Sequence, residues 1–232
     1  MNVVVTGASK GIGKAVAAAF AVEGHQLFLC SRNEKMLMQT AGELGNRFPA
    51  SMINVQACDL SEKAGAQEFG NWCLSKGTPD VLVNNAGLFE PGNVSDEADG
   101  AMERQMSTNL YSAYHLTRAL LPSMVKQKSG HIFNVCSIAA LKAYPNGGAY
   151  SISKFALHGF TINLRHEMKA HGIKVTAVHP GAVMTDSWAG FDNSQNRIME
   201  AEDIAAMVLA ATRLSIQACV EEIVIRPQLG DL

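Results

Sequence analysis

Short apolar runs rich in β-branched residues alternate with longer amphipathic segments along this chain of 232 residues. The runs are apolar almost throughout, so the strands that they predict are buried on both faces, which is typical of a parallel sheet. Regular alternation of strands and helices predicts right-handed crossovers and a doubly wound α/β fold. The predicted strands are residues 3–6, 26–31, 52–58, 80–84, 130–137, 173–179 and 221–226.

The segments between these strands predict helices at residues 11–23, 33–47, 61–76, 108–126, 148–171 and 201–213. The chain has no internal repeat, low-complexity tract or linker, so residues 1–232 are predicted to form one three-layer α/β/α domain. Residues 186–200 break the pattern by mixing aromatic residues, glycine and asparagine. We expect them to form a mobile loop over the end of the sheet where ligands of such folds bind.

Composition argues against several classes of function. A formal net charge of −2 gives no reason to expect a nucleic acid or an anionic membrane as partner. The first residues lack the basic and apolar regions of a secretory signal, and the longest apolar run, residues 15–22, is too short to span a bilayer. The five cysteines are scattered without CxxC spacing, so disulfides are not predicted and a reducing cytoplasm is the expected compartment.

The sequence gives no sign of a metal site. The histidines of the second half of the chain show no ligand spacing, and we interpret them as surface or packing residues: His131, His158, His166, His171 and His179. Glu221 and Glu222 are interpreted as a solvated strand end.

Tyr150 and Lys154 stand four residues apart in a predicted helix, so they lie on one face, one turn from each other. A phenol has an unperturbed pKa of about 10, and a nearby ammonium favours the phenolate and lowers that pKa. Such a tyrosine can act as a general acid near neutral pH. The alternative is a surface lysine beside a half-buried tyrosine, and the rest of the chain decides between the two.

The stretch Thr6-Gly7-Ala8-Ser9-Lys10-Gly11-Ile12-Gly13 joins the first predicted strand to the first predicted helix. Glycines at this place let the backbone approach a pyrophosphate, and the N-terminus of the helix stabilises its charge. The position of the turn in a β-α-β chain predicts a dinucleotide site, and thus an NAD(P)-binding Rossmann domain. Its spacing is G-x-x-x-G-x-G rather than the commoner G-x-G-x-x-G.

With this spacing the chain resembles the short-chain dehydrogenase/reductase family, of the non-extended type, along essentially its whole length. Further motifs fall where the family has them: Asn84-Asn85-Ala86-Gly87, Asn109, Ser137, Tyr150, Lys154 and Pro180-Gly181. The resemblance implies an enzyme that transfers hydride between a nicotinamide cofactor and a small carbonyl or alcohol substrate. It also implies cofactor contacts from Gly7, Ser9, Gly11, Ile12, Gly13, Asn85, Ala86, Gly87, Tyr150, Lys154, Pro180, Gly181, Val183 and Thr185.

The resemblance implies four catalytic roles. Tyr150 would donate the proton in reduction, and Lys154 would lower the pKa of that tyrosine and bind the nicotinamide ribose. Ser137 would hydrogen-bond the substrate oxygen, and Asn109 would hold a water that links Lys154 to solvent. The residues alone justify only the Tyr150–Lys154 pair. Ser137 could instead cap the turn after its strand, and Asn109 could be a satisfied polar residue within its helix.

The second predicted strand ends at Ser31-Arg32 without the acidic side chain that an NAD-selective site usually carries there. The planar fork of Arg32 can pair with a 2′-phosphate, and Lys10 in the glycine-rich turn could add a second positive charge. The sequence therefore predicts NADP(H) as the cofactor, with an NAD-preferring enzyme as the alternative. Asp59-Leu60 resembles the pair that contacts adenine in the family, although Asp59 could equally be a helix N-cap.

The sequence constrains the substrate less closely. Leu88, Phe89, Tyr144, Trp188 and Phe191 border the predicted loop and suggest an apolar pocket for a compact carbonyl compound. Residues 201–205 and the ending from Val220 to Asp231 resemble those of bacterial sepiapterin-reductase-like members. The alternatives are a 3-oxoacyl-carrier-protein reductase-like enzyme and a non-catalytic NADP-binding sensor. Apolar residues on more than one face of the helices at 108–126 and 148–171 predict a homodimer or homotetramer.

Overall fold

The computed structural model describes residues 1–188 and 190–232. In this part of the chain a seven-stranded, fully parallel sheet has the order β3-β2-β1-β4-β5-β6-β7. Its strands are β1 (Asn2–Thr6), β2 (Gln26–Ser31), β3 (Ile53–Ala57), β4 (Val81–Asn84), β5 (Gly130–Val135), β6 (Ile173–Pro180) and β7 (Glu222–Ile225). The order reverses between β1 and β4, and folds of this kind bind ligands outside the carboxyl ends of the strands at that point.

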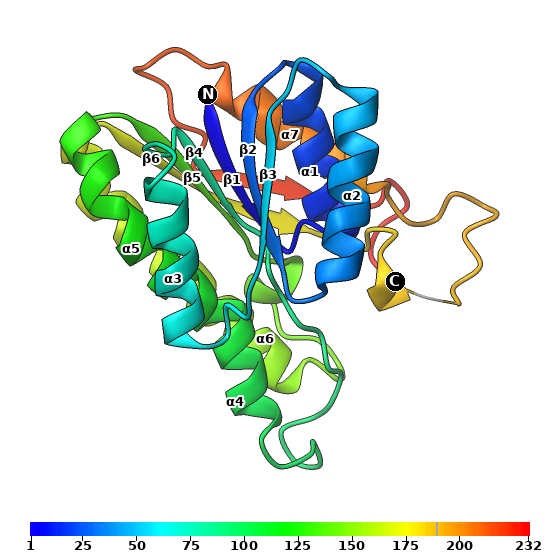
Figure 1. Ribbon diagram of the computed structural model, residues 1–232. Coiled ribbons are helices and arrows are strands. Elements are labelled where there is room, and N and C mark those ends of the chain that lie inside the picture. The colour runs from blue at the N-terminus through cyan, green and yellow to red at the C-terminus, as the bar shows by residue number, and fades with distance from the viewer. Residues whose placement is uncertain (189) are drawn as a thin grey trace.

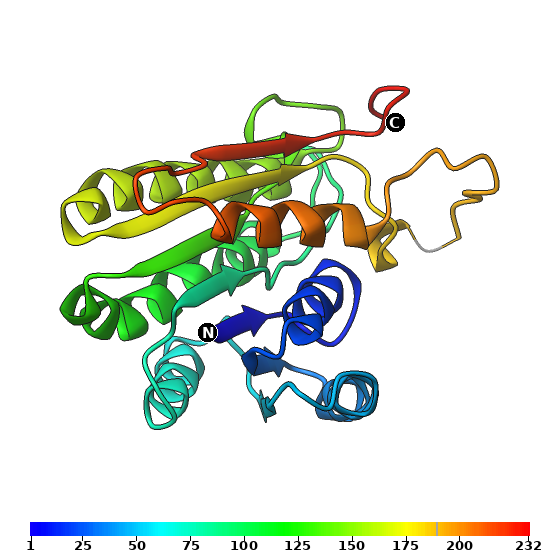
Figure 2. The ribbon, with the colours of Figure 1, turned by 90° about the horizontal axis from the view of Figure 1, so that it is seen from above.

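Helices cover both faces of the sheet, so the molecule has three layers (Figures 1 and 2). The core of one face includes α1 (Gly11–Val22), α2 (Glu34–Arg47) and α7 (Ala201–Thr212). On the other face the core includes α3 (Lys63–Leu74), α5 (Ser112–Gln127) and α6 (Gly148–Met168). The central strands are apolar because these two layers bury both of their faces. The predicted doubly wound α/β fold and single domain are confirmed.

The segment before α5 differs from the prediction of one helix centred on residues 108–126. A short helix, α4 (Ala101–Met106), comes first, and a π-helical turn (Ser107–Tyr111) joins it to α5. A π turn is wider than an α turn, and such turns are frequent at functional sites. Apolar periodicity does not reveal it, because the residues on either side continue the helical pattern. The turn contains Asn109, which is buried.

The predicted loop at residues 186–200 begins with a short 3-10 turn (Asp186–Trp188). Its base is closed by a parallel bridge between Val183 and Met199. Residues 190–199 extend away from the sheet in both views (Figures 1 and 2). Ala189, which belongs to the predicted loop, lies outside the described residues, and the mobility of the loop stays a prediction. Within residues 1–188 and 190–232, none of the helices has the length and hydropathy of a membrane span.

The start of α1 packs against the turn after β1 without room for a side chain. Gly7 and Gly11 have φ angles of 62° and 53°, a region that favours glycine. A Cβ on Gly13 would lie 2.3 Å from the carbonyl oxygen of Gly7 and 2.5 Å from Nδ2 of Asn85. The three glycines of the motif therefore serve the fold as well as any ligand, because they let α1 meet the switch point of the sheet.

We predict opposite effects from one substitution at two helical glycines. Gly13→Ala should lower the free energy of unfolding by about 2 to 3 kcal/mol, because its methyl group would overlap backbone atoms. Gly45 lies within α2, and apart from its chain neighbours and the backbone of its own helix no atom lies within 4 Å of an added Cβ. Gly45→Ala should raise the free energy of unfolding by about 0.5 to 1 kcal/mol, because alanine loses less backbone entropy in a helix. Urea unfolding followed by circular dichroism measures both changes, and a neutral Gly13→Ala would contradict the close packing.

Candidate active site

The N-terminus of α1 has free donors. Lys10 precedes the helix with an extended backbone, its side chain does not cap the helix, and the first turn carries no acidic residue. The first amides of a helix have no partner within the helix and point outward with the positive end of its dipole. Together with the glycines that keep side chains out of the way, this arrangement fits a pyrophosphate at residues Gly11–Gly13.

Two hydrogen bonds fix the shape of the glycine-rich turn. The amide of Ala8 donates to the carbonyl of Cys30 at 3.0 Å, and the Thr40 hydroxyl donates to the carbonyl of Ser9 at 2.9 Å. The turn is thereby held against the end of β2, which Arg32 follows, and against α2. Arg32 is exposed and makes no ion pair with any described residue. Its guanidinium is therefore available to an anion near the second strand.

Lys10, which the sequence suggested as a second contact to a 2′-phosphate, already has a partner within the protein. Its ammonium forms an ion pair with Asp186 at the start of the loop, and both side chains are exposed. An exposed pair of this kind contributes little to stability. A 2′-phosphate would nevertheless have to compete with Asp186 for Lys10, so Arg32 is the better supported of the two predicted phosphate contacts.

Asp59 is not a helix N-cap, which corrects one of the two interpretations of Asp59-Leu60. Its carboxylate accepts hydrogen bonds from the amide and hydroxyl of Ser61, at 2.9 and 2.7 Å, whereas α3 begins after Glu62. Asp59 thus closes a turn between β3 and α3. Leu60 is buried.

The segment Asn85-Ala86-Gly87 connects the predicted cofactor turn with the predicted catalytic residues. Nδ2 of Asn85 donates to the carbonyls of Thr6 and Gly7 at 2.9 and 3.2 Å. Two residues later, a Cβ on Gly87 would lie 3.3 Å from Oδ1 of Asn109 and 3.5 Å from Nζ of Lys154. The end of β4 therefore touches the β1–α1 turn on one side and the lysine on the other.

Tyr150 lies near Ser137. Burial raises the pKa of the Tyr150 phenol to about 12, against a smaller lowering by the Ser137 side chain. The Ser137 hydroxyl also accepts from the amide of Ala139 at 3.1 Å, so the residue caps its turn as well. Phe89 packs edge-on against the Tyr150 ring, with 4.8 Å between ring centroids. The phenol is consequently protonated throughout the neutral range.

Lys154 lies on the same side of α6 as Tyr150, with Nζ 5.8 Å from the centre of the tyrosine ring. Its ammonium donates to the carbonyl of Val135 at 2.9 Å, and burial lowers its own pKa to about 8. In this arrangement burial of the phenol is the largest influence on the tyrosine pKa, because it takes the phenolate out of water. That Lys154 lowers this pKa stays a prediction.

Asn109 uses its whole amide group within the protein. Oδ1 accepts from the amide of Leu88 at 2.7 Å, while Nδ2 donates to the carbonyl of Leu88 at 2.9 Å and to the Ser153 hydroxyl at 2.8 Å. It therefore ties the segment after β4 to α6. A carbonyl oxygen has two lone pairs, so Oδ1 can accept one more hydrogen bond beside Lys154. The predicted water at this place stays a prediction.

The segment from Pro180 to Thr185 runs from the end of β6 to the β1–α1 turn. Gly181 donates to the carbonyl of Ile225 at 2.7 Å, and Val183 is buried. A Cβ on Gly11 would lie 3.1 Å from Cγ2 of Thr185. The sequence-predicted residues Pro180, Gly181, Val183 and Thr185 therefore lead to the N-terminus of α1, as a cofactor segment would require.

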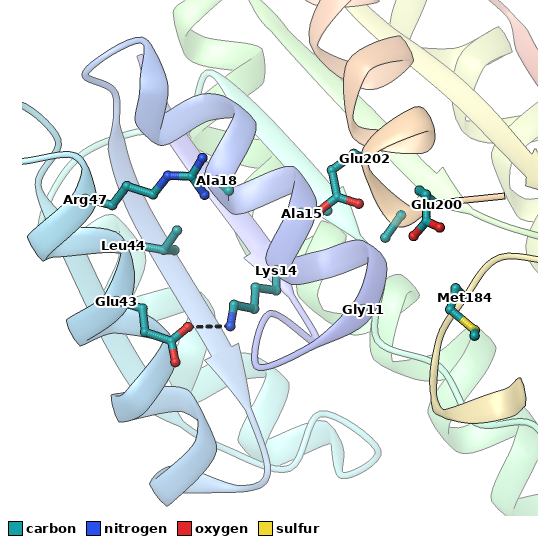
Figure 3. A pocket seen from close by; sticks show the side chains of 11 residues that line it. Gly11, Lys14, Ala15, Ala18, Glu43, Leu44, Arg47, Met184, Glu200 and Glu202 are labelled. Atoms are coloured by element: carbon teal, nitrogen blue, oxygen red, sulfur yellow. Dashed lines mark hydrogen bonds and ion pairs between the residues drawn. The ribbon is translucent and has the colours of Figure 1, made fainter. Parts of the chain in front are cut away.

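A hollow beside the first turn of α1 is lined by residues of α1, α2, α7 and the loop, including Lys14, Glu43, Arg47 and Met184 (Figure 3). The Lys14 ammonium and the Glu43 carboxylate form an ion pair across it. The lining includes neither Tyr150 nor Ser137, so this hollow is not the predicted substrate pocket. Of the predicted pocket residues, Trp188 packs on Phe191, whereas Phe89 packs on Tyr150.

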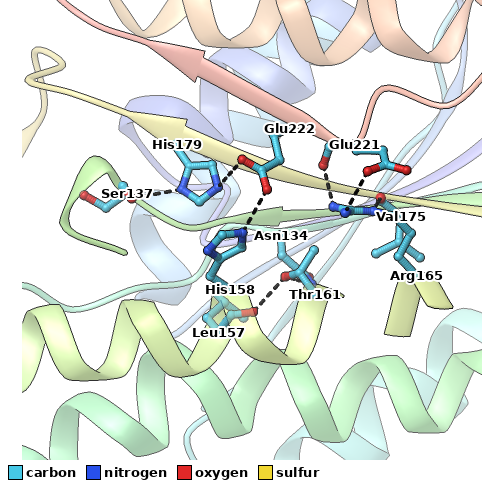
Figure 4. Close-up of polar contacts among 10 residues, drawn as sticks. All are labelled: Asn134, Ser137, Leu157, His158, Thr161, Arg165, Val175, His179, Glu221 and Glu222. Atoms are coloured by element: carbon cyan, nitrogen blue, oxygen red, sulfur yellow. Dashed lines mark hydrogen bonds and ion pairs between the residues drawn. The ribbon is translucent and has the colours of Figure 1, made fainter. Parts of the chain in front are cut away.

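The sequence missed one cluster of polar side chains. His158, His179 and Glu222 come together between α6 and the edge of the sheet, with one ligand-type atom of each within 4.8 Å of the others (Figure 4). The His179 ring lies 3.0 Å from the carbonyl oxygen of Ser137 through Nδ1. The interpretation of these histidines as surface or packing residues did not foresee that His158 and His179 lie next to each other. Their separation in the sequence carries no signal, because strand order brings them together.

Known proteins resemble the chain throughout its length. A family model described as short chain dehydrogenase matches residues 1–196. The sepiapterin reductase of Chlorobaculum tepidum is 35% identical over 237 residues, covering 98% of this chain and 96% of that protein. A metagenomic short-chain oxidoreductase, solved in complex with NADP, is 30% identical with a TM-score of 0.85, covering 98% of this chain and 97% of that one.

A 3-oxoacyl-[acyl-carrier protein] reductase from Brucella melitensis has the same fold, with 28% identity and a TM-score of 0.87, covering 97% of this chain and 89% of that one. The family model, the sepiapterin reductase and the shared fold all agree with the ordered motifs found in the sequence. The chain therefore belongs to the short-chain dehydrogenase family and is an oxidoreductase.

Proposed function

We propose that the protein is an NADPH-dependent reductase of a small carbonyl compound, with Tyr150 as the proton donor. The observation that carries this proposal is the protonated phenol of Tyr150 near Ser137. Lys154, on the same helix, lies next to Gly87, and the segment that contains Gly87 reaches the glycine-rich turn. NADP in the solved metagenomic relative supports the choice of cofactor. When bound, NADPH supplies the hydride for the carbonyl carbon.

The cofactor would lie across the carboxyl ends of the strands. Gly7, Ser9, Gly11, Ile12 and Gly13 would face its pyrophosphate. Ser31, Arg32, Asp59 and Leu60 would face its adenosine half. Its nicotinamide half would meet residues Asn85, Ala86, Gly87, Tyr150, Lys154, Pro180, Gly181, Val183 and Thr185. No side chain caps the N-terminus of α1 among the described residues, so its amides are available to a phosphate of the cofactor.

Ser137 and Tyr150 would both hydrogen-bond the substrate oxygen and so stabilise the charge that develops on it. Transfer of the Tyr150 proton to that oxygen is favourable, because an alkoxide is about as basic as hydroxide, whose conjugate acid has a pKa of about 15.7. A protonated Tyr150 is ready to act as the acid in reduction, whereas oxidation would need it to lose its proton first. Lys154 would hold the ribose, and Asn109 would keep the Leu88 segment in place beside it.

A pteridine-like carbonyl compound is our first candidate substrate, because the Chlorobaculum sepiapterin reductase is similar to almost the whole chain. The aromatic residues near Tyr150 suit a flat, conjugated ring, and Phe89 already packs on the tyrosine. An acyl-carrier thioester is the second candidate, on the likeness to the Brucella enzyme. Turnover of sepiapterin compared with that of an acetoacetyl thioester distinguishes the two.

We expect Tyr150→Phe to lower kcat at least about a hundredfold while the Kd for NADPH stays within a few fold. The phenol supplies only the proton, and general acid catalysis contributes on the order of a hundredfold to ten-thousandfold. Loss of NADPH absorbance with a panel of carbonyl compounds measures kcat, and quenching of tryptophan fluorescence measures binding. Tyr111→Phe, which removes an exposed hydroxyl, is the matched control. A Tyr150→Phe variant within tenfold of the wild type would exclude this residue as the acid.

Arg32 should determine the preference for NADPH over NADH. A hydrogen bond to a charged group contributes roughly 1.5 to 3 kcal/mol, and each 1.4 kcal/mol is about tenfold in affinity. Arg32→Asp removes this contact and repels the 2′-phosphate, so the ratio of kcat/KM for NADPH to that for NADH should fall at least about a hundredfold. Lys126→Asp makes the same change of charge in α5 and should leave the ratio unchanged. An unchanged ratio in Arg32→Asp would show that Arg32 faces solvent.

We expect the protein to form a homodimer or homotetramer through α6 and its neighbour α5. One face of α6 is buried in the core, yet Ile152, Phe155 and Ile162 on another face are 42%, 46% and 46% exposed. A helix that is apolar on two faces is usually buried on both. Light scattering at micromolar concentration should give a multiple of the 24.8 kDa chain mass. Phe155→Glu should lower that mass, whereas a single-chain mass for the wild type would contradict the prediction.

A further inference from the structure

His158, His179 and Glu222 meet on the α6 side of the sheet edge, although they come from three different elements. His158 belongs to α6, His179 to β6, and Glu222 begins the edge strand β7 (Figure 4). Nε2 of His158 lies 3.1 Å from Oε1 of Glu222, and Nε2 of His179 lies 4.0 Å from Oε2 of the same carboxylate. The centroids of the two imidazole rings are 4.6 Å apart. Two ring nitrogens and a carboxylate therefore converge on one point.

The Nε2 atom of His179 is oriented so that it can bind an ion. Its side chain is 0% exposed, and its Nδ1 lies 3.0 Å from the Ser137 carbonyl oxygen, which can only accept a hydrogen bond. Nδ1 therefore carries the proton, and Nε2 presents a lone pair to the cluster. Among the described residues, this Nε2 is a buried atom without a hydrogen-bond partner. A buried polar atom left unpaired is costly, and such an atom calls for an explanation, of which an ion is one.

The other groups around the cluster fit a cation. Glu222 provides a negative charge, and its side chain is 40% exposed, so the third ligand borders on solvent, where a water could complete the coordination. The guanidinium of Arg165 is the nearby positive group. It is already engaged by the carbonyl oxygens of Val175 and Glu221, and it also pairs with the Glu221 carboxylate.

The set of donors points to a particular class of ion. Imidazole nitrogens suit zinc and similar transition metals, whereas Mg²⁺ and Ca²⁺ prefer oxygen ligands throughout. Tetrahedral zinc with bonds of about 2.0 to 2.1 Å places its ligand atoms about 3.3 Å apart. The two histidine–Glu222 separations are 3.1 and 4.0 Å, and the three ligand atoms all lie within 4.8 Å of one another. Rotation of His158 and Glu222, which are both partly exposed, would bring the ligand atoms to this spacing around the buried His179. His158 would have to move its proton from Nε2 to Nδ1, which a neutral imidazole can do through solvent.

We propose that His158, His179 and Glu222 form a binding site for Zn²⁺ or a similar divalent transition-metal ion. The ion would join α6, β6 and β7 at the edge of the sheet. The hydrogen bond from Nδ1 of His179 to the Ser137 carbonyl is the kind of outer contact that orients a ligating histidine. The ion would therefore also steady the backbone of Ser137 without touching the substrate. The spacing of the three residues in the chain does not indicate this site, and the proposal does not depend on the identity of the substrate.

The test is metal binding by the purified full-length protein after treatment with a chelator. Calorimetric titration with ZnCl₂ should show one ion per chain, and Co²⁺ should give the strong visible absorption of tetrahedral coordination. His158→Gln and Glu222→Gln each remove one ligand at a partly exposed position, and each should weaken binding at least about tenfold. His166→Gln and Glu167→Gln change exposed residues of the same helix and should leave binding unchanged.

A second measurement does not rely on counting ions. Zinc at about a hundred times its Kd should raise the midpoint of thermal unfolding by about 5 to 10 °C in the wild type. The same addition should have little effect on His158→Gln or Glu222→Gln, once circular dichroism has shown that both are folded. Absence of binding, or binding that the two ligand variants retain, would overturn the proposal. So would binding that is lost equally in the His166→Gln and Glu167→Gln controls.

Discussion

The close approach of α1 to the turn after β1 is the constraint on which the rest of the structure depends. It is possible only because Gly13 has no side chain where the Gly7 carbonyl and the Asn85 amide meet it. Asn85 bonds the same turn, so β1, α1 and the end of β4 are fixed together at the point where the strand order reverses. The uncapped N-terminus of α1 and the residues around Lys154 derive their relative positions from this single junction.

Burial gives the catalytic half of the site its electrostatic character. It raises the pKa of Tyr150 to about 12 and lowers the pKa of Lys154 to about 8, because each charged form is taken out of water. The pair is therefore closer to neutral than two isolated side chains would be. A protonated phenol near Ser137 suits donation of a proton, and the buried environment, rather than the lysine alone, is what keeps it protonated.

The hydrogen bond from His179 to Ser137 gives the sheet edge a connection to the active site. His179 lies on β6, Ser137 follows β5, and these strands are neighbours in the sheet. A contact at the outer edge, where Glu222 begins β7, can thus reach Ser137 through one buried ring. In this arrangement the positions of the edge strand and of Ser137 are linked by polar contacts as well as by packing.

The sequence by itself determined the α/β class, the parallel sheet, the family and the residues that line the ends of the strands, because apolar periodicity and the spacing within motifs are local. Tyr150 and Lys154 share one face of a helix for the same local reason. Tertiary structure alone decided that the pKa of Tyr150 is raised rather than lowered from its ordinary value. It also decided the pairing of Lys10 with Asp186 and the π turn that contains Asn109. It also decided the meeting of His158, His179 and Glu222. These features depend on burial and on contacts between residues far apart in the chain, and no local pattern in the sequence records either.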